Sequence, residues 1–249
     1  MSDLRIRVLG FGMGPAHLTP EVVEALAGVD YVIAADKAGP AGTDPLLAVR
    51  RQVAATADVP VVAVPDPARD RDNPRDYPGA VRDWHQARID AYEAVLRERG
   101  GTAAFLVWGD PSLYDSVIRI VAALAERTGA EWDVLPGISA PQLLAARHRI
   151  VLHPVGRPVH ITPARRWREA VESGQTNLVV MLGTAADLDA VAAAVPDWQI
   201  WWGANLGADS ERLVAGTVGE VLPSVQAARA AAAEDAGWVM DLFVLRAPA

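Results

Sequence analysis

Short apolar runs alternate with segments of helical spacing along almost the whole chain, and this alternation restricts the possible folds more than any other feature. Residues 4–10 form an apolar run that ends in glycines. Thr19-Pro20-Glu21 then provides a helix start, with a threonine N-cap and proline at the first helical position. A second apolar run, 30–35, follows that helix. Strands that alternate with helices in this way predict βαβ units, a largely parallel sheet and an α/β fold.

The same pattern predicts the other elements. Further strands are expected at 59–64, 102–107, 131–135, 159–162, 177–182, 199–204 and 238–245. The helices are expected at 18–27, 45–55, 83–99, 112–127, 138–146, 165–172, 185–194 and 219–232.

Two segments interrupt the alternation. The run HPVGRP at 153–158 marks the expected domain boundary, which gives an N-terminal α/β domain over 1–152 and a C-terminal α/β domain over 153–249. A chain of 249 residues is long enough for two small domains. The stretch 65–78 is rich in Pro, Asp and Arg and lacks apolar periodicity, so it predicts a long functional or mobile loop.

The composition excludes several classes of function. The net charge of −8 disfavours nonspecific binding to nucleic acid. The absence of cysteine excludes a disulfide framework, a thiolate metal site and a cysteine nucleophile. No apolar run approaches the ~20 residues that span a bilayer, and the first residues lack the apolar core of a signal peptide. We therefore expect no membrane partner, no nucleic-acid partner and a cytoplasmic location.

One segment of this acidic chain is basic. Residues 134–168 contain no Asp or Glu. They contain six arginines and three histidines: Arg147, Arg149, Arg157, Arg165, Arg166, Arg168, His148, His153 and His160. Arginine binds carboxylates with two parallel hydrogen bonds, so this segment indicates an anionic ligand of limited size. The alternative is a solvated basic face, which is the usual role of a charge run.

The glycine-rich turn GFGMGP at 10–15 follows the first expected strand. Gly12 and Gly14 allow the backbone to turn sharply and to approach a ligand closely. A dinucleotide-binding turn is the alternative, with Asp36 at the end of the second strand as the ribose-binding acid. That motif needs a third glycine where this chain has Pro15, and its helix starts directly, whereas Pro15-Ala16-His17 delays the helix here. We therefore disfavour a nucleotide-dependent oxidoreductase.

A second turn, Trp108-Gly109-Asp110-Pro111, follows the expected strand 102–107. Ligands of open α/β sheets bind at the carboxyl ends of strands, so this turn and the turn at 10–14 are expected at one edge of a parallel sheet. Gly109 allows close approach, and Asp110 can accept hydrogen bonds from a ligand. The alternative role for Asp110 is to cap the next helix.

Two later segments have the same character. The sequence LPGISA at 135–140 again reads as strand, turn and helix, and Ser139 either caps the helix or contacts a ligand. The sequence Asn205-Leu206-Gly207 follows another expected strand and precedes Glu211 and Arg212.

Five segments in order resemble the tetrapyrrole methylase family. They are GFGMGPAHLT (10–19), WGDPSLY (108–114), PGISA (136–140), NLVVMLG (177–183) and NLGADSERL (205–213). Each is weak alone, but five in this order are specific, and the resemblance extends from about residue 4 to 245. Three further features resemble the family members of cobalamin synthesis that release acetate. These are IAADK at 33–37, the Asp/Arg-rich insert at 66–88 and Trp108 before Gly-Asp-Pro, where the family more often has a small residue.

The resemblance implies two α/β domains with a cofactor cleft between them, S-adenosyl-L-methionine as cofactor, S-adenosyl-L-homocysteine as product, no metal and usually a homodimer. By motif position it implies these cofactor-binding residues: Gly12, Gly14, Pro15, Trp108, Gly109, Asp110, Leu113, Ser139, Ala140, Met181, Leu182 and Leu206. For Leu182 and Leu206, core packing is the alternative that periodicity alone favours. S-adenosylmethionine carries an activated methyl group, so positioning the acceptor carbon supplies much of the acceleration.

The implied reaction is methylation of C-1 of precorrin-5, a tetrapyrrole, with loss of the extruded carbon as acetate. Release of acetate requires water to attack a carbonyl, which a general base assists. Asp36, His85 and Asp110 are the candidate catalytic residues, and Tyr31 is a further possibility. Arg147, Arg149 and Arg157 are the candidates for binding the substrate carboxylates.

Alternatives from other classes remain open at this stage. The same fold serves other precorrin methyltransferases and RNA or protein methylases, although the acidic net charge argues against RNA. A non-catalytic binding protein is the last alternative, and several glycine-rich strand ends argue against it.

Overall fold

The protein is represented by a computed structural model that describes residues 4–37, 44–67 and 77–248. Most of the loop expected at 65–78 lies outside the described residues. The chain divides into two compact units, Met1–Ile138 and Ser139–Ala249. The division comes before the boundary expected at 153 because helix α5 (Ala140–His148) packs against strands of the second unit.

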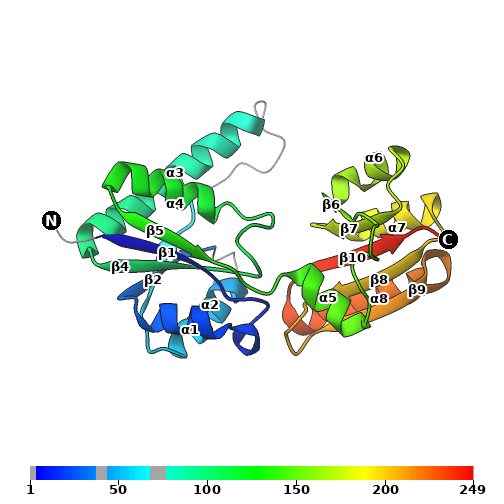
Figure 1. The fold of residues 1–249 in the computed structure, drawn as a ribbon, viewed down its shortest axis with the longest axis horizontal. Helices are drawn as coiled ribbons and strands as arrows, with labels where there is room; N and C mark the ends of the chain where they lie inside the picture. The colour runs from blue at the N-terminus through cyan, green and yellow to red at the C-terminus, as the bar shows by residue number, and fades with distance from the viewer. Residues whose placement is uncertain (1–3, 38–43, 68–76, 249) are drawn as a thin grey trace. The chain divides into compact units, whose positions relative to one another are not determined.

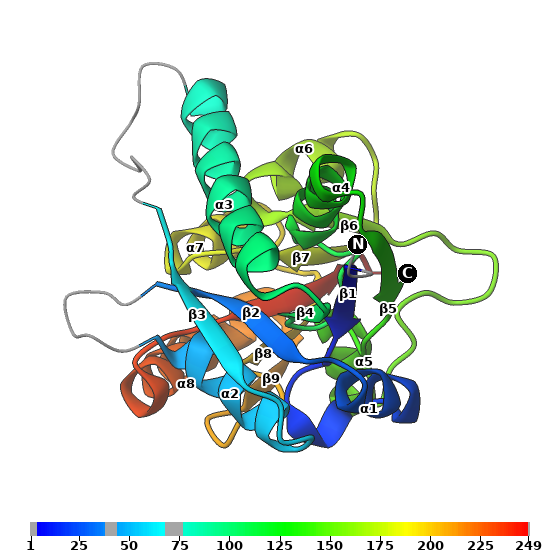
Figure 2. The same cartoon turned by 90° about the vertical axis from the view of Figure 1, so that its left-hand side faces the viewer.

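The N-terminal unit is a five-stranded sheet in which every pairing is parallel. Its strand order is β3-β2-β4-β1-β5 (Figure 2). The strands are β1 (Arg5–Gly10), β2 (Tyr31–Asp36), β3 (Val61–Pro65), β4 (Thr102–Val107) and β5 (Glu131–Leu135). The helices are α1 (Pro20–Ala27), α2 (Pro45–Ala55), α3 (Tyr77–Arg99) and α4 (Val117–Thr128), and a short 3₁₀ helix, η1, covers Pro15–His17.

The helices cover both faces of this sheet. Helices α1 and α2 lie on one face, and α3 and α4 on the other (Figures 1 and 2). One core therefore joins Leu9 and Leu106 of the strands to Leu26 of α1, and the other joins Ile6 and Phe105 to Leu96 of α3. A parallel sheet that is covered on both faces explains why its strands read as continuous apolar runs.

Local sequence signals position the helix starts. Thr19 accepts a hydrogen bond from the Val22 N–H at 3.2 Å, and proline takes the next position. Asp44 caps α2 in the same way through Leu46 and Leu47. The expected helix at 112–127 begins later, at Val117, because the residues after Asp110 form turns instead.

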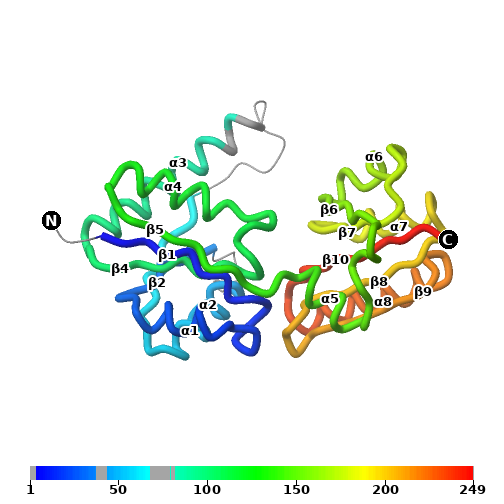
Figure 3. Tube along the Cα trace, viewed as in Figure 1, coloured from blue at the N-terminus to red at the C-terminus, as the bar shows by residue number. Residues whose placement is uncertain are grey.

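The C-terminal unit has a second five-stranded sheet, ordered β6-β7-β10-β8-β9 (Figure 3). Its strands are β6 (His160–Pro163), β7 (Asn177–Met181), β8 (Gln199–Ala204), β9 (Arg212–Thr217) and β10 (Asp241–Arg246). Its other helices are α6 (Trp167–Glu172), α7 (Ala185–Ala194) and α8 (Val218–Ala236), with a 3₁₀ turn, η2, at Ala164–Arg166.

The expectation of largely parallel pairing is wrong for this second sheet. Only β6 and β7 pair in parallel, while β10 runs antiparallel to both β7 and β8, and β9 runs antiparallel to β8. The last strand lies between β7 and β8, so both of its neighbours come from earlier in the chain. Periodicity cannot predict such pairing, because it reports burial and not strand direction.

The core of the second unit is built around Trp202, Phe243 and Trp167, which are buried. The Trp202 indole N–H donates to Asp241 at 3.1 Å, and Arg229 forms an ion pair with the same carboxylate at 3.0 Å. No helix within the described ranges is long and apolar enough to cross a membrane.

Candidate active site

Two glycine turns meet at the carboxyl edge of the first sheet. The Gly12 N–H donates to the Gly109 carbonyl at 3.3 Å, and the Gly109 N–H donates back to the Gly12 carbonyl at 2.8 Å. The loop after β1 is therefore bonded directly to the loop after β4. The expectation that these turns lie together at one edge of a parallel sheet is confirmed.

The turn after β5 joins the same group. The Gly137 N–H donates to the Asp110 carboxylate at 3.1 Å. A Cβ atom on Gly137 would collide with the Gly109 carbonyl oxygen and would lie 2.7 Å from the Gly10 carbonyl carbon. Three loops, after β1, β4 and β5, are thus packed backbone to backbone.

Backbone conformation also restricts two of these positions to glycine. Gly12 has φ of 65° and Gly109 has φ of 71°, a region that L side chains rarely adopt. A Cβ on Gly12 would also lie 2.7 Å from Cβ of His17. Backbone conformation explains both glycines, and contact with His17 adds to it for Gly12, apart from any ligand.

Asp110 does not cap a helix. Helix α4 begins at Val117 with Ser116 at its N-cap position, so the capping alternative is wrong. One Asp110 oxygen accepts from the N–H of Ser112 at 2.9 Å and from its hydroxyl at 2.5 Å, while the other oxygen accepts from Gly137. Through these hydrogen bonds the carboxylate stabilises the 108–116 loop and joins it to the turn after β5.

Partial burial is the largest single influence on Asp110 and raises its pKa. The hydrogen bonds from Ser112 and Gly137 together outweigh burial and leave the pKa of Asp110 below its ordinary value. The carboxyl group is therefore ionised at neutral pH, and its oxygens already accept hydrogen bonds. This arrangement favours binding over proton transfer.

The neighbouring residues of these turns form a partly apolar surface. Trp108 packs edge-on against Phe11, with ring centroids 5.5 Å apart. Leu113 is half-buried, and its N–H donates to the Asp110 carbonyl. Gly14 precedes the 3₁₀ helix that begins at Pro15, whose side chain is exposed.

The start of α1 at Pro20 leaves a 3₁₀ turn between the glycines and the helix. In a dinucleotide fold the helix N-terminus lies directly at the pyrophosphate. The observed spacing gives no support to the oxidoreductase alternative.

Ser139 is committed to helix capping. Its hydroxyl accepts from the Gln142 N–H, and the Gln142 side chain accepts from the Ser139 N–H, which makes a complete capping box. Ser139 is 5% exposed, and Ala140 is half-buried as the first residue of α5. Contact of either residue with a cofactor stays a prediction.

The candidates of the second unit gather at one edge of its sheet. Met181 ends β7, and Leu206 follows the end of β8; both strands reach this edge on either side of β10. Leu206 is 1% exposed, which agrees with the core-packing interpretation. Leu182 is 63% exposed with φ of 60°, so core packing does not explain it.

Asn205 holds the turn that carries Leu206, a role that the sequence analysis did not identify. Its amide donates to Ser210, Ala232 and Trp238, and its side-chain oxygen accepts from the Met240 N–H at 2.9 Å. The positive φ of 48° suits asparagine. The sequence signal that could have found this role is an asparagine directly after an expected strand.

Two arginines of the basic segment are already neutralised, one by a distant acid and one by an acid just beyond the segment. Arg147 forms an ion pair with Glu211 at 2.9 Å, and Arg166 pairs with Glu169 at 2.8 Å. Arg149 and Arg157 are exposed and make no ion pair among the residues that the structure describes. Of the three proposed substrate ligands, Arg147 is therefore the one already occupied.

The candidate proton-transfer residues lie in the first unit. Asp36 ends β2, at the same edge as Asp110, and His85 lies in α3 with its ring edge-on to Trp84. Their roles stay predictions. Tyr31 is unsuited, because it begins β2 and its hydroxyl donates to the Gly100 carbonyl at 3.0 Å, at the opposite edge of the sheet.

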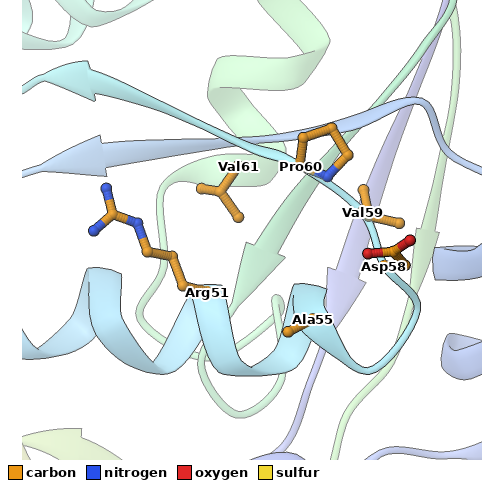
Figure 4. Close-up of a pocket in the computed structure, with 6 residues that line it drawn as sticks. All are labelled: Arg51, Ala55, Asp58, Val59, Pro60 and Val61. Atoms are coloured by element: carbon orange, nitrogen blue, oxygen red, sulfur yellow. The ribbon is translucent and has the colours of Figure 1, made fainter.

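Two other features carry no catalytic interpretation. A cavity of about 340 Å³ at the amino end of β3 is lined by Arg51, Ala55, Asp58, Val59, Pro60 and Val61 (Figure 4). It lies at the edge of the sheet away from the three loops. Within the described part of the chain, His, Asp and Glu side chains form no group of three or more that could hold a metal ion.

Comparison with known proteins defines the class. Residues 5–222 match the family described as Tetrapyrrole (Corrin/Porphyrin) Methylases, and the chain belongs to this family. The chain is similar to a precorrin-6A synthase [deacetylating] from Sinorhizobium sp, with 41% identity over 253 residues that cover 97% of this chain and 95% of the relative.

Solved structures agree. A putative cobalamin synthesis related protein (CobF) from Corynebacterium diphtheriae has a TM-score of 0.81 and 34% identity, covering 98% of both chains. A uroporphyrin-III C-methyl transferase from Thermus thermophilus, solved with S-adenyl homocysteine, has a TM-score of 0.59 and 18% identity over 97% of this chain and 92% of its own. The second match shows the fold alone.

We expect Gly137→Ala to destabilise the N-terminal unit by about 2 kcal/mol or more, because overpacking against backbone is poorly relieved. Gly28→Ala is the matched control, since a Cβ there meets nothing closer than 3.6 Å. Urea unfolding of both variants measures the difference. Equal stability of the two variants would contradict the close packing of the three loops.

Asp110→Asn should lower the free energy of unfolding at neutral pH by about 1 kcal/mol, the scale of a partly exposed charged hydrogen bond. Because folding lowers the pKa of Asp110, its ionisation stabilises the fold above the ordinary aspartate pKa of about 3.9. This stabilisation is lost as the pH falls through the folded-state pKa. The free energies of unfolding of the parent and of Asp110→Asn should therefore become equal in acid. Asp209→Asn, a change at an exposed residue, should match the parent at every pH. A stability difference between the parent and Asp110→Asn that persists in acid would show that the charge of Asp110 does not stabilise the fold.

Proposed function

We propose that the chain is an S-adenosylmethionine-dependent methyltransferase of cobalamin synthesis with the activity of precorrin-6A synthase (deacetylating). In this reaction C-1 of precorrin-5 is methylated and acetate is released. The observation that carries the proposal is the similarity to the Sinorhizobium relative over nearly the full length of both chains. The three joined loops at the carboxyl edge of the first sheet support it.

The residues of these loops fit such a cofactor. The close packing of Gly12, Gly109 and Gly137 leaves backbone groups at the sheet edge, and the ionised Asp110 can accept hydrogen bonds from hydroxyl or ammonium groups. When bound, S-adenosylmethionine would supply an activated methyl group. Trp108 and Leu113 would exclude water beside it. Contact of Met181, Leu182 or Leu206 with the cofactor stays a prediction.

Release of acetate is a separate step. Water adds to the acetyl carbonyl carbon, the bond from that carbon to the ring breaks, and its electron pair and a proton stay with the macrocycle. A base that removes a proton from the water would assist the step. Asp36 and His85 are the proposed bases, because the hydrogen bonds to Asp110 stabilise its ionised form and make it a weak base.

A second candidate within the class is another precorrin methyltransferase. The chain is 31% identical to a Precorrin-2 C(20)-methyltransferase from Sinorhizobium sp over 137 residues, which cover 54% of each chain. Incubation with precorrin-5 and labelled S-adenosylmethionine distinguishes the two. We expect one methyl group transferred and one acetate formed per turnover, and methylation of precorrin-2 instead would support the second candidate. A homodimer in the cytoplasm stays a prediction.

Asp110→Ala should weaken binding of S-adenosylhomocysteine by about tenfold, because one hydrogen bond from a ligand to an ionised carboxylate is lost. Ser112→Ala is the control, since it removes one hydroxyl that holds Asp110 and keeps the carboxylate. Calorimetric titration of folded variants measures the affinity. If Asp110→Ala binds like the parent, the carboxylate only joins the loops.

Replacing Arg149 and Arg157 together with Gln should raise KM for the tetrapyrrole several-fold, because each exposed arginine–carboxylate pair contributes about 0.2–1 kcal/mol. The affinity for S-adenosylhomocysteine should not change. Arg147→Gln is the comparison, since Glu211 already pairs with that residue. An unchanged KM in the double variant would make the basic segment a solvated face.

A further inference from the structure

Strands β2 and β4 separate at their carboxyl ends. Their pairing runs from Tyr31 with Ala103 to Ile33 with Phe105 and ends there. Beyond that point β2 continues to pair with β3 as far as Asp36. Strand β4 continues to pair with β1 as far as Val107. The sheet therefore opens between β2 and β4 at the edge that carries the three loops.

The topology favours a ligand in this opening. The helix that follows β2 lies on one face of the sheet, whereas the helix that follows β4 lies on the other (Figure 2). Such a reversal between neighbouring strands is where open α/β sheets bind ligands, outside the carboxyl ends of the strands.

Arg50 of α2 reaches this opening. Its Nε donates to the Leu106 carbonyl at 3.0 Å, an oxygen beyond the end of the β2–β4 pairing, and its Nη1 donates to the Leu46 carbonyl at 3.2 Å. Within the described ranges, Nη2 has no hydrogen bond and no carboxylate lies within ion-pair distance. Burial lowers the pKa of Arg50, although a guanidinium remains charged. A half-buried cation without an ionic partner among the described residues favours the binding of an anion.

Tyr92 of α3 approaches from the other face of the sheet. The residue is 5% exposed and packs edge-on against Phe105, with ring centroids 5.2 Å apart. Its hydroxyl makes no hydrogen bond to any described residue and is not among the fully buried polar atoms. Arg50 and Arg88 are close enough to lower the pKa of this phenol, against the larger effect of burial, which raises it.

The acids around this opening already have partners. Asp66 forms a buried ion pair with Arg88 at 2.5 Å, and Arg88 also stacks on Trp84 at 4.0 Å. Asp44 accepts from three backbone N–H groups, those of Lys37, Leu46 and Leu47. Asp115 accepts from the Val117 N–H. The free donors of Arg50 and Tyr92 are therefore available to another acceptor.

We propose that the opening between β2 and β4 is a carboxylate-binding subsite, in which the Arg50 guanidinium and the Tyr92 hydroxyl donate to the carboxylate. Its source is either a side chain of the tetrapyrrole substrate or the acetate that the reaction releases. The binding of a carboxylate depends only on the described geometry, whereas the choice between these sources rests on the proposed function.

Acetate is the probe, with chloride at equal ionic strength as the reference. Line broadening of labelled acetate in NMR spectra reports binding without any turnover. Tyr92→Phe should weaken acetate binding about tenfold, because a hydrogen bond to a charged group is lost. This variant removes only a hydroxyl that makes no hydrogen bond to the described residues, so it should fold as the parent does. Tyr31→Phe is the matched control, since that hydroxyl bonds to Gly100 at the opposite edge.

Arg50→Lys is the second variant. It keeps the positive charge and loses the forked donors, so acetate binding should weaken at least as much as in Tyr92→Phe. Acetate that fails to bind the parent, or that binds the parent and both variants equally, would overturn the subsite. Either result would leave methyl transfer to precorrin-5 unaffected, so the failure of this inference differs from a failure of the proposed function.

Steady-state kinetics distinguish the two sources. If the subsite holds a substrate side chain, Tyr92→Phe raises KM for the tetrapyrrole, and acetate competes with that substrate. If it holds the released acetate, Tyr92→Phe leaves KM unchanged and weakens the inhibition of turnover by added acetate, which does not compete with the tetrapyrrole. Both results support the subsite. If Tyr92→Phe has the same kinetic constants as the parent, the subsite has no role in the reaction, and its connection to the proposed function is overturned.

Discussion

The hydrogen bond from the Gly137 N–H to the Asp110 carboxylate is the contact on which the candidate active site depends. It joins the loop after β4 to the turn after β5, while paired hydrogen bonds between Gly12 and Gly109 join the loop after β1. These loops belong to adjacent strands of the first sheet, β4, β1 and β5. Their separation in sequence is large, so the parallel register brings them together.

This arrangement makes the backbone, and not a set of reactive side chains, the main component of the site. Gly10 and Gly137 allow the loops to approach more closely than any Cβ would permit. A rigid edge of this kind suits a reaction whose activated group arrives on the cofactor, because the protein then contributes mainly by positioning. The ionised Asp110, held by Ser112 and Gly137, agrees with a binding role.

Charge is distributed differently from what the basic segment suggests. Glu211 neutralises Arg147 across 64 positions of sequence and also accepts from the Gly207 N–H, so it connects α5 to the turn after β8. Arg50 lies in the first unit, outside that segment, and has carbonyl partners but no ionic partner among the described residues. A half-buried guanidinium that two carbonyls hold in an opening of the sheet is a more specific anion site than exposed arginines on a surface.

The sequence by itself determined the order of the elements, because their signals are local. Proline after an N-cap residue starts α1 and α2, and the apolar run 102–107 agrees with β4 residue for residue. Glycines after strands also indicated the first-unit edge of the site. Only the tertiary structure decided the antiparallel pairing of β10, the placing of Tyr31 at the opposite edge, and the pairing of Arg147. Those outcomes depend on strand direction and on contacts between distant residues, and the periodicity of apolar residues in the sequence reports neither.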